Sequence, residues 1–322
     1  MRVLLTAPYV GEIGWELMAW QARVRLLFHR GGFDRLVVLG SAGKEAFYQD
    51  MPLDYRPVEP AGLPGVAYED RRLLPDNQPM SRSELRAFVE PAVRAAAGEL
   101  AQSGCQTHIL CPPYAGKPWP CDRRHQRFIR FQSPHPDPRG APWVVLVPRT
   151  RGFGAANWTA AQWEELAGSL DGVGVGISTL PCEAAAAIEM LSACDLAVGQ
   201  STGGLHLASL CGCPHLVWAA EPSRLWTPWS ITNRQRYQTF WNPLGTPVEF
   251  RPVGELPTPA QAAEWTLRAL ERIGRRTGRA APRAQFRCTW HWRRWLAKRV
   301  LPARPLRYCP WPVQRLVRYR LV

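Results

Sequence analysis

The chain has 322 residues, which is too many for one small hydrophobic core and suits two domains of roughly 100–200 residues each. No uncharged stretch approaches the roughly 20 residues of a membrane-spanning helix, and the opening apolar run is too short for a secretory signal. The nine cysteines are scattered, which predicts free thiols in a cytoplasmic protein. The net charge of +14 lies in residues 268–322, which hold 16 Lys and Arg and one acid, so the nearly neutral remainder is not expected to bind nucleic acid.

The first half of the chain is predicted to be one α/β unit. Short apolar runs predict buried strands at residues 2–8, 35–40 and 107–112. Helices are predicted around residues 15–29, 43–49 and 84–103. Strands that alternate with helices indicate a parallel sheet covered on both faces.

A stretch dense in proline and charge follows, and it predicts a linker with a domain boundary near residues 135–142. The alternation then resumes, with strands expected at 143–148, 172–178, 195–199 and 214–220 and helices at 159–170, 182–194 and 203–212. We therefore expect Rossmann-like domains over 1–138 and 139–257, then C-terminal helices and a basic aromatic tail over 258–322. Such domains place a cleft at the carboxyl ends of their strands.

The sequence "GQSTGGLHL" in the second unit joins a strand to a helix through small polar residues. A helix N-terminus offers free backbone N–H groups and a partial positive charge, and glycines allow an anion to approach closely. Ser201 and Thr202 can cap the helix or donate hydroxyl groups to a phosphate, and His206 follows one turn later. This pattern predicts an anion site, although a capped helix without a ligand has the same signature.

The loop "PRTRGFGAANWT" leaves another strand of the same predicted sheet. Arg149 and Arg151 are placed to neutralise a diphosphate, which guanidinium groups bind in a bidentate manner. Thr159 is expected to cap the next helix. Loops after two strands of one sheet can converge on one cleft, although a solvated surface loop would also carry these charges.

The segment over about residues 143–220 resembles the donor-binding domain of the ADP-heptose:lipopolysaccharide heptosyltransferases and related two-domain glycosyltransferases of the GT-B type. The likeness rests on "NWTAAQW" followed by "DLAVGQSTGGLHLASLCGCP", which occur in the family's order and spacing. It implies a nucleotide-sugar donor whose diphosphate is held by residues after two strands. These residues are Arg149, Arg151, Asn157, Ser201, Thr202, Gly203, Gly204 and His206.

Three departures from the family pattern leave the identity of the donor open. Gln200 and Ser201 replace the usual acidic position before Thr-Gly, Asn157 stands where a phosphate-contacting lysine is common, and Thr159 replaces the proline that follows the tryptophan. Glu221 follows a further strand, where it can serve as a hydrogen-bond partner for a ribose or sugar hydroxyl or simply as a loop acid.

Inverting glycosyl transfer needs a carboxylate that accepts the proton of the attacking hydroxyl. The loop "GEIGWE" follows the first predicted strand, and in the heptosyltransferases a Gly-Asp pair at the corresponding place supplies this base. Glu16 and Glu12 both compete for the role, with Glu16 slightly favoured. An acid at a helix N-terminus also favours the helix dipole by roughly 0.3–1 kcal/mol without any catalytic role.

The chain contains no Asp-x-Asp pair of the kind that binds a divalent ion in sugar-nucleotide transferases of the other main fold. We therefore expect a metal-independent, inverting glycosyltransferase without a cofactor, acting on a cell-envelope glycan or a lipid-linked acceptor. A nucleotide-sugar epimerase of the same fold is the nearest alternative. A non-catalytic, membrane-tethered protein that binds a nucleotide or carbohydrate is another.

The C-terminal tail separates aromatic from basic side chains when drawn as a helix over residues 285–301. Trp292 and Trp295 fall on one face, and Arg294 and Lys298 fall on the other. This pattern favours binding of residues 285–322 to an anionic membrane, and thus a peripheral position at the inner face of the plasma membrane. The alternatives are a helix packed on the body and a segment that binds a phosphate backbone.

Overall fold

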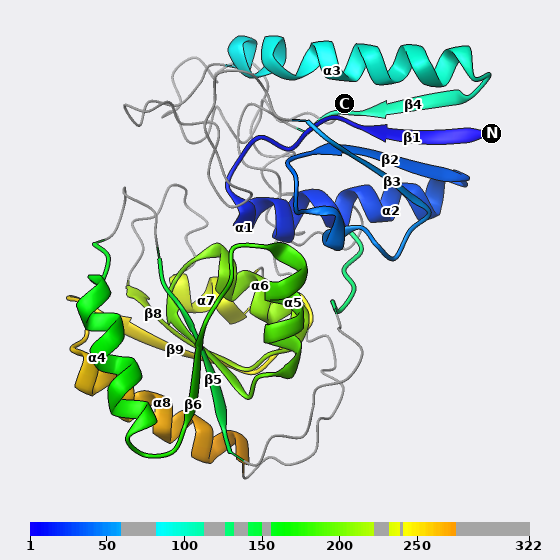
Figure 1. The fold of residues 1–322 in the computed structure, drawn as a ribbon. Coiled ribbons are helices and arrows are strands. Elements are labelled where there is room, and N and C mark those ends of the chain that lie inside the picture. Colours follow the sequence, from blue (N-terminus) through cyan, green and yellow to red (C-terminus); the bar gives the residue numbers. More distant parts are fainter. Residues whose placement is uncertain are drawn as a thin grey trace, which may run out of the picture.

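The computed structural model describes residues 1–58, 82–112, 126–131, 141–149, 156–221, 232–238 and 241–274. These residues form two parallel β-sheets with helices on both faces, which confirms the α/β class (Figure 1). Arg151 and the tail beyond residue 274, with its predicted tryptophan-rich helix, lie outside the described residues.

The first sheet has the strand order β3-β2-β1-β4. Its parallel strands are β1 (Arg2–Thr6), β2 (Arg35–Gly40), β3 (Leu53–Pro57) and β4 (Gln106–Leu110). The helical elements of this unit are α1 (Ile13–Trp15), the π-helix η1 (Glu16–Trp20), α2 (Gln21–Gly31), the 3-10 turn η2 (Glu45–Phe47) and α3 (Arg82–Gln102).

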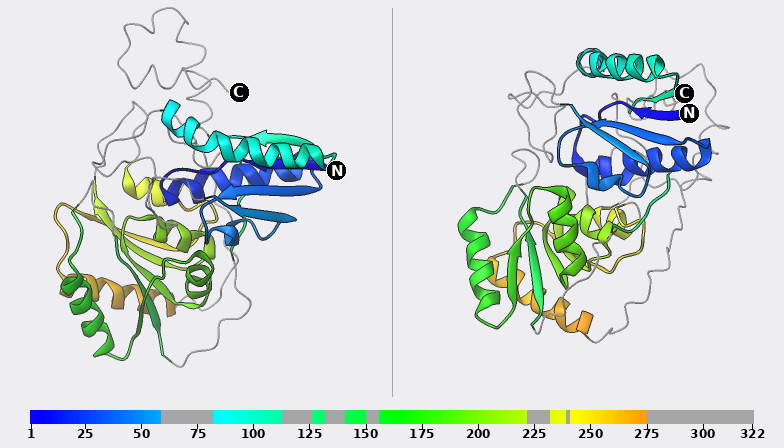
Figure 2. Two further views of the ribbon diagram at one scale, coloured as in Figure 1. Left: turned by 45° about the horizontal axis from the view of Figure 1, so that its top comes forward. Right: turned by 45° about the vertical axis from the view of Figure 1, so that its right-hand side comes forward.

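Successive side chains of the central strand β1 point to opposite faces, as the pleat requires. Val3 and Leu5 pack under α3, whereas Leu4 packs with Val24 of α2. Figures 1 and 2 show the consequence, because α3 covers the outer face and α2 covers the face turned toward the second sheet. The central strands β1 and β2 are therefore held between two helical layers.

The second sheet has the order β6-β5-β7-β8-β9, and its strands are also parallel. The strands are β5 (Trp143–Val147), β6 (Gly176–Thr179), β7 (Leu196–Gln200), β8 (His215–Ala220) and β9 (Val248–Val253). The helices are α4 (Ala160–Asp171), α5 (Ala184–Ala193), α6 (Gly203–Cys211), α7 (Asn233–Gln238) and α8 (Pro259–Gly274).

Two helical layers also enclose this second sheet. α4 and α8 cover one face, where Leu166 and Ala262 share an apolar cluster with Val144 of β5. α5 and α6 cover the other face. Thr159 caps α4 through a complete capping box with Gln162, as the sequence predicted. The helix α8, which we placed in the third segment of the chain, thus packs on the second sheet.

One apolar cluster runs from the α2 side of the first sheet to the α5–α6 side of the second. Residues 126–131 connect the two units. At one end of this segment the Arg127 N–H donates to Ala22 O at 2.8 Å, and at the other end the Phe131 N–H donates to Leu210 O at 3.0 Å. The two units are consequently in close apolar contact.

The other predicted strands and helices of both units are confirmed, apart from shifts of a few residues at their ends, but the helix predicted at residues 43–49 is only the 3-10 turn η2 (Glu45–Phe47). Three elements were not predicted, namely β3, β9 and α7. Among the described residues, none of the helices is long and apolar enough to cross a bilayer. The described cysteines are all free thiols, as expected.

Candidate active site between the two sheets

The loop after β1 and the N-terminus of α6 meet at a pair of glycines. A Cβ atom on Gly14 would lie 2.5 Å from Nδ1 of His206, and the Cα atom of Gly203 would be 3.8 Å away. A Cβ atom on Gly203 would collide with the side chain of Ile13. Side chains at either position would force the backbones apart, so this contact requires glycine on both sides.

Glu12 precedes α1 and lies at the edge of this contact. Its carbonyl oxygen accepts the backbone N–H groups of Trp15 at 3.0 Å and of Glu16 at 3.3 Å, which fixes the turn. Its side chain is half-buried and does not cap the helix. Glu12 is also close enough to Tyr237 for its carboxylate to help raise the pKa of that phenol, although burial is the main cause.

Tyr237 lies beside the loop that precedes α6. Its hydroxyl donates a hydrogen bond to Ser201 Oγ at 2.9 Å. Ser201 and Thr202 are half-buried, and the side chain of Thr202 does not cap α6. Glu12 from the first unit and the two hydroxyl residues of the second unit therefore share one neighbourhood.

Glu16, the acid that the sequence slightly favoured as the base, lies elsewhere. It is buried, and its Oε2 atom forms an ion pair with Lys44 Nζ at 2.5 Å. Tyr48 Oη lies 3.5 Å from the other oxygen, and burial followed by the Glu16 carboxylate raises the pKa of Tyr48 well above its usual value. In this conformation Glu16 is occupied by partners within its own unit.

His206 requires a correction, because the sequence predicted that it faces a bound anion. Its ring is buried and packs against Trp241, with ring centroids 4.6 Å apart, and against the backbone of Gly14. Neither ring nitrogen has a hydrogen-bond partner among the described residues. Burial, with a smaller contribution from His215, lowers the pKa of His206 to about 3, so the ring is neutral. His206 fills the contact between the two units.

The two glycines of the turn also have a packing role that the sequence did not indicate. A Cβ atom on Gly204 would lie 2.6 Å from Val147 Cγ1 and 2.7 Å from Leu180 Cδ2. Gly204 therefore allows α6 to approach the sheet, and Gly203 allows it to approach α1. Both glycines are explained without a ligand.

The carboxyl ends of β5 and β7 are connected through Gln200, which is buried at the end of β7. Its Nε2 group donates to Ala156 O at 2.7 Å, and its Oε1 atom accepts the Trp158 N–H at 3.3 Å. In the same loop region Arg149, directly after β5, donates to the side chain of Asn157. The structure thus brings Arg149 and Asn157 together at the carboxyl edge of the sheet.

Glu221 follows β8, as expected, and forms an ion pair with Arg234 of α7 at 3.6 Å. The described residues contain no cluster of His, Cys, Asp and Glu that could hold a metal ion. Lys44 and Tyr237 were missed by the sequence interpretation. Neither belongs to a motif, and only the fold places them beside Glu16 and Ser201.

Comparison with known proteins identifies the fold. No protein-family model matches the sequence, and no curated protein matches it. The structure resembles a glycosyl transferase family 9 protein from Veillonella parvula, with a TM-score of 0.51 and 8% identity over 86% of this chain and 98% of that one. At this identity the likeness shows a shared fold.

Two Escherichia coli structures are also similar. ADP-heptose LPS heptosyltransferase II has a TM-score of 0.47 and 15% identity, over 85% of this chain and 100% of that one. Heptosyltransferase WaaC with ADP has a TM-score of 0.43 and 14% identity, with the same coverage.

Proposed function

We propose that this protein is an inverting, metal-independent glycosyltransferase that uses a nucleotide-sugar donor. The observation that carries the proposal is the meeting of the acidic loop after β1 with the hydroxyl-bearing N-terminus of α6, in a fold shared with a family 9 glycosyl transferase. Ligands of doubly wound folds bind at the carboxyl ends of strands, where both segments lie.

Glu12 is our choice for the general base. Glu12 is half-buried and close enough to Tyr237 to influence the pKa of that phenol, whereas Glu16 is held in a buried ion pair. In the proposed reaction Glu12 accepts the proton of the acceptor hydroxyl while that oxygen attacks the anomeric carbon. The bond between the anomeric carbon and the diphosphate breaks on the opposite face of the sugar, which inverts the configuration.

The leaving diphosphate needs positive partners. The free backbone N–H groups at the start of α6 and the hydroxyl groups of Ser201 and Thr202 supply hydrogen-bond donors. Arg149 supplies a guanidinium from the neighbouring loop, and Arg151 is assigned to the same role from the sequence. These groups stabilise the charge that develops on the diphosphate without a metal ion.

A thermal-shift screen with nucleoside diphosphates and nucleotide sugars tests donor binding directly. A ligand present at about 100 times its Kd stabilises the native state by roughly 2.7 kcal/mol, which is a readily measured rise in Tm. Substitution Ser201→Ala should reduce that rise, and Ser169→Ala on the exposed side of α4 is a matched control. Absence of a shift with every nucleotide would refute the proposed donor site.

Product analysis separates the proposed reaction from its alternatives. Transfer to an added acceptor supports a glycosyltransferase, release of an isomerised sugar nucleotide would indicate an epimerase, and binding without turnover would indicate a non-catalytic protein. Loss of transfer after treatment with a chelator would contradict the metal-independent mechanism.

We further propose that the acceptor is a cell-envelope glycan or lipid-linked sugar and that the enzyme works at the inner face of the plasma membrane. The proposal rests on the basic, tryptophan-rich sequence of residues 285–322. Deletion of residues 280–322 should abolish sedimentation with anionic liposomes. Unchanged sedimentation would refute the membrane role of the tail.

A further inference from the structure

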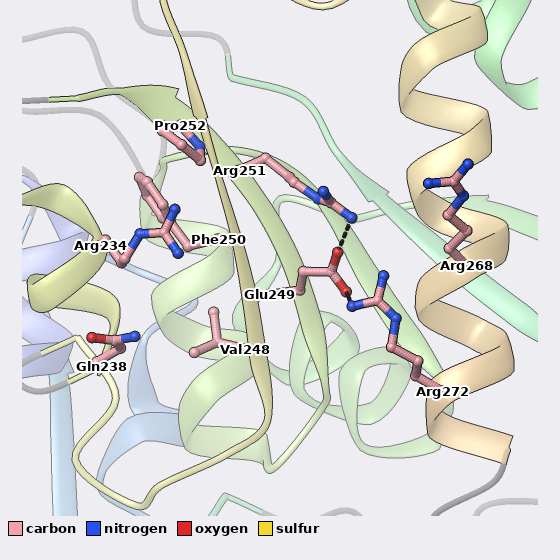
Figure 3. Close-up of a pocket in the computed structure, with 9 residues that line it drawn as sticks. All are labelled: Arg234, Gln238, Val248, Glu249, Phe250, Arg251, Pro252, Arg268 and Arg272. Atoms are coloured by element: carbon pink, nitrogen blue, oxygen red, sulfur yellow. Dashed lines mark ion pairs between the residues drawn. The ribbon is translucent and has the colours of Figure 1, made fainter.

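A surface depression outside the candidate active site lies along β9, the edge strand of the second sheet. A depression of about 440 Å³ is lined by five consecutive residues of β9 together with side chains of α7 and α8. Figure 3 shows these residues on both sides of the strand. The lining residues are Arg234, Gln238, Val248, Glu249, Phe250, Arg251, Pro252, Arg268 and Arg272. None of them belongs to the candidate active site, although Arg234 pairs with Glu221.

The backbone of β9 has an unoccupied edge among the described residues. β9 pairs with β8 on one side only, and the His215 N–H of β8 donates to Pro247 O at 3.1 Å. Because backbone groups alternate in direction along a strand, Val248, Phe250 and Pro252 direct theirs away from β8. Pro252 has no N–H group, so the edge offers two donors and three acceptors to another strand.

The two faces of β9 differ in chemistry beside this edge. On the α8 face, Glu249 forms ion pairs with both Arg251 and Arg272, the latter at 3.0 Å. Arg268, one turn before Arg272 on α8, is more than half exposed. On this face three arginines, Arg251, Arg268 and Arg272, line the depression beside Glu249, and Arg268 also pairs with Glu264 of α8, which leaves a net positive charge.

The α7 face combines apolar side chains of β9 with Arg234 and Gln238 of α7. Val248 and Phe250 belong to the apolar core on this side of the sheet, and the Arg234 guanidinium lies over the Phe250 ring, 5.8 Å from its centroid. On the opposite face Arg251 lies over the ring of Trp265 in α8 at 5.4 Å. A strand that paired with β9 would therefore meet Arg251, Arg268 and Arg272 on the α8 face. On the α7 face it would meet Val248 and Phe250, with Arg234 over the Phe250 ring.

We propose that the outer edge of β9 binds an extended segment of a partner protein by strand addition, and that alternate side chains of this segment are acidic. Strand addition obtains affinity from main-chain hydrogen bonds and specificity from alternate side chains. Acids at every second position would meet Arg251, Arg268 and Arg272, while the intervening apolar residues would lie toward Val248 and Phe250.

Charge argues against two other occupants. The segment of this chain that follows α8 is itself strongly basic, with 14 Lys and Arg and no acid over residues 275–322. A second copy that paired through its own β9 would bring arginine rows of like charge together, which is destabilising. An acidic partner has the complementary charge.

The test uses the full-length protein and two labelled peptides, one that alternates Glu and Val and one of the same composition with its glutamates in a block. Fluorescence anisotropy should show tighter binding of the alternating peptide. The substitutions Arg268→Ala and Arg272→Ala together should weaken that binding by roughly 2- to 30-fold, because each exposed ion pair contributes modestly. Arg30→Ala with Arg94→Ala, on exposed positions of the first unit, is the matched control and should leave binding unchanged.

Hydrogen–deuterium exchange tests the strand geometry without any substitution. The alternating peptide should slow exchange of the Val248 and Phe250 amides, whereas the Glu249 and Arg251 amides already face β8 and should change little. The proposal is overturned if neither peptide binds, if both bind equally, or if inorganic phosphate or polyphosphate displaces the alternating peptide without protection of these two amides. The last result would instead identify a general polyanion site.

Discussion

The substitution Gly14→Ala tests the contact between the two units most sharply. The new Cβ atom would lie 2.5 Å from His206 Nδ1 and 3.0 Å from Cε1 of the same ring. The ring cannot move aside easily, because it is buried against Trp241 and Tyr237. Forcing a methyl group into such a packed site typically costs about 1–3 kcal/mol.

A double-mutant cycle with His206→Ala isolates the cause of this cost. Once the ring is removed, the nearest atom to the new Cβ would be Gly203 Cα at 3.8 Å, which is an ordinary contact. Gly14→Ala should then cost less than about 1 kcal/mol, with a coupling energy of roughly 0.5–3 kcal/mol between the two positions. Alanine also has the better helix propensity, which acts in the same direction.

Urea-induced unfolding of the four proteins in the cycle gives the free energies. Gly98→Ala is the control, because Gly98 is an exposed residue of α3 with no atom within 4 Å of its added Cβ. That control should be neutral or stabilising by up to about 1 kcal/mol. Strictly additive costs for Gly14→Ala and His206→Ala would refute the close contact of the two units.

Two further predictions concern buried charged and titratable groups. Glu16→Gln should destabilise the protein by about 3–5 kcal/mol, because it leaves Lys44 buried without its partner. Adding Lys44→Met should restore part of this loss. Equal stability of the single and the double variant in urea would contradict the buried pair. Burial lowers the pKa of His206 to about 3 and of His215 to about 4. Above about pH 6.5, the ordinary histidine pKa, both rings are neutral in the folded and the unfolded protein, and the native state has its full stability. As the pH falls below about 6.5 toward the two lowered values, the unfolded protein binds protons that the folded protein does not, and the stability falls. At pH 5 each histidine should lower the free energy of unfolding by about 2 kcal/mol relative to pH 7.5, and a stability that does not change with pH over this range in the wild type would refute the assignment.

Much of the fold follows from local sequence patterns. The apolar runs that form β1, β2, β5 and β7 are fully buried strands of parallel sheets, and such strands are recognisable because nearly every side chain is apolar. β3 and β9 lie at sheet edges, where half-exposed polar residues interrupt the apolar pattern. These strands could not be recognised from periodicity alone.

The candidate site was less predictable, because its decisive contacts join residues that are distant in the sequence. Glu12 and Glu16 are equivalent as sequence features, and they differ only because the fold brings Lys44 to Glu16 and Tyr237 to the neighbourhood of Glu12. In the same way, nothing local indicated that His206 would pack against Gly14.

The most direct test of the proposed function is the rate of sugar transfer by Glu12→Gln, with the donor identified by thermal shift. General-base catalysis typically contributes about 10²- to 10⁴-fold, so transfer should fall by that factor while donor binding and Tm stay close to those of the wild type. Glu45→Gln, an exposed acid of the same unit, should transfer normally. Transfer by Glu12→Gln at the wild-type rate would contradict the assignment of Glu12 as the base.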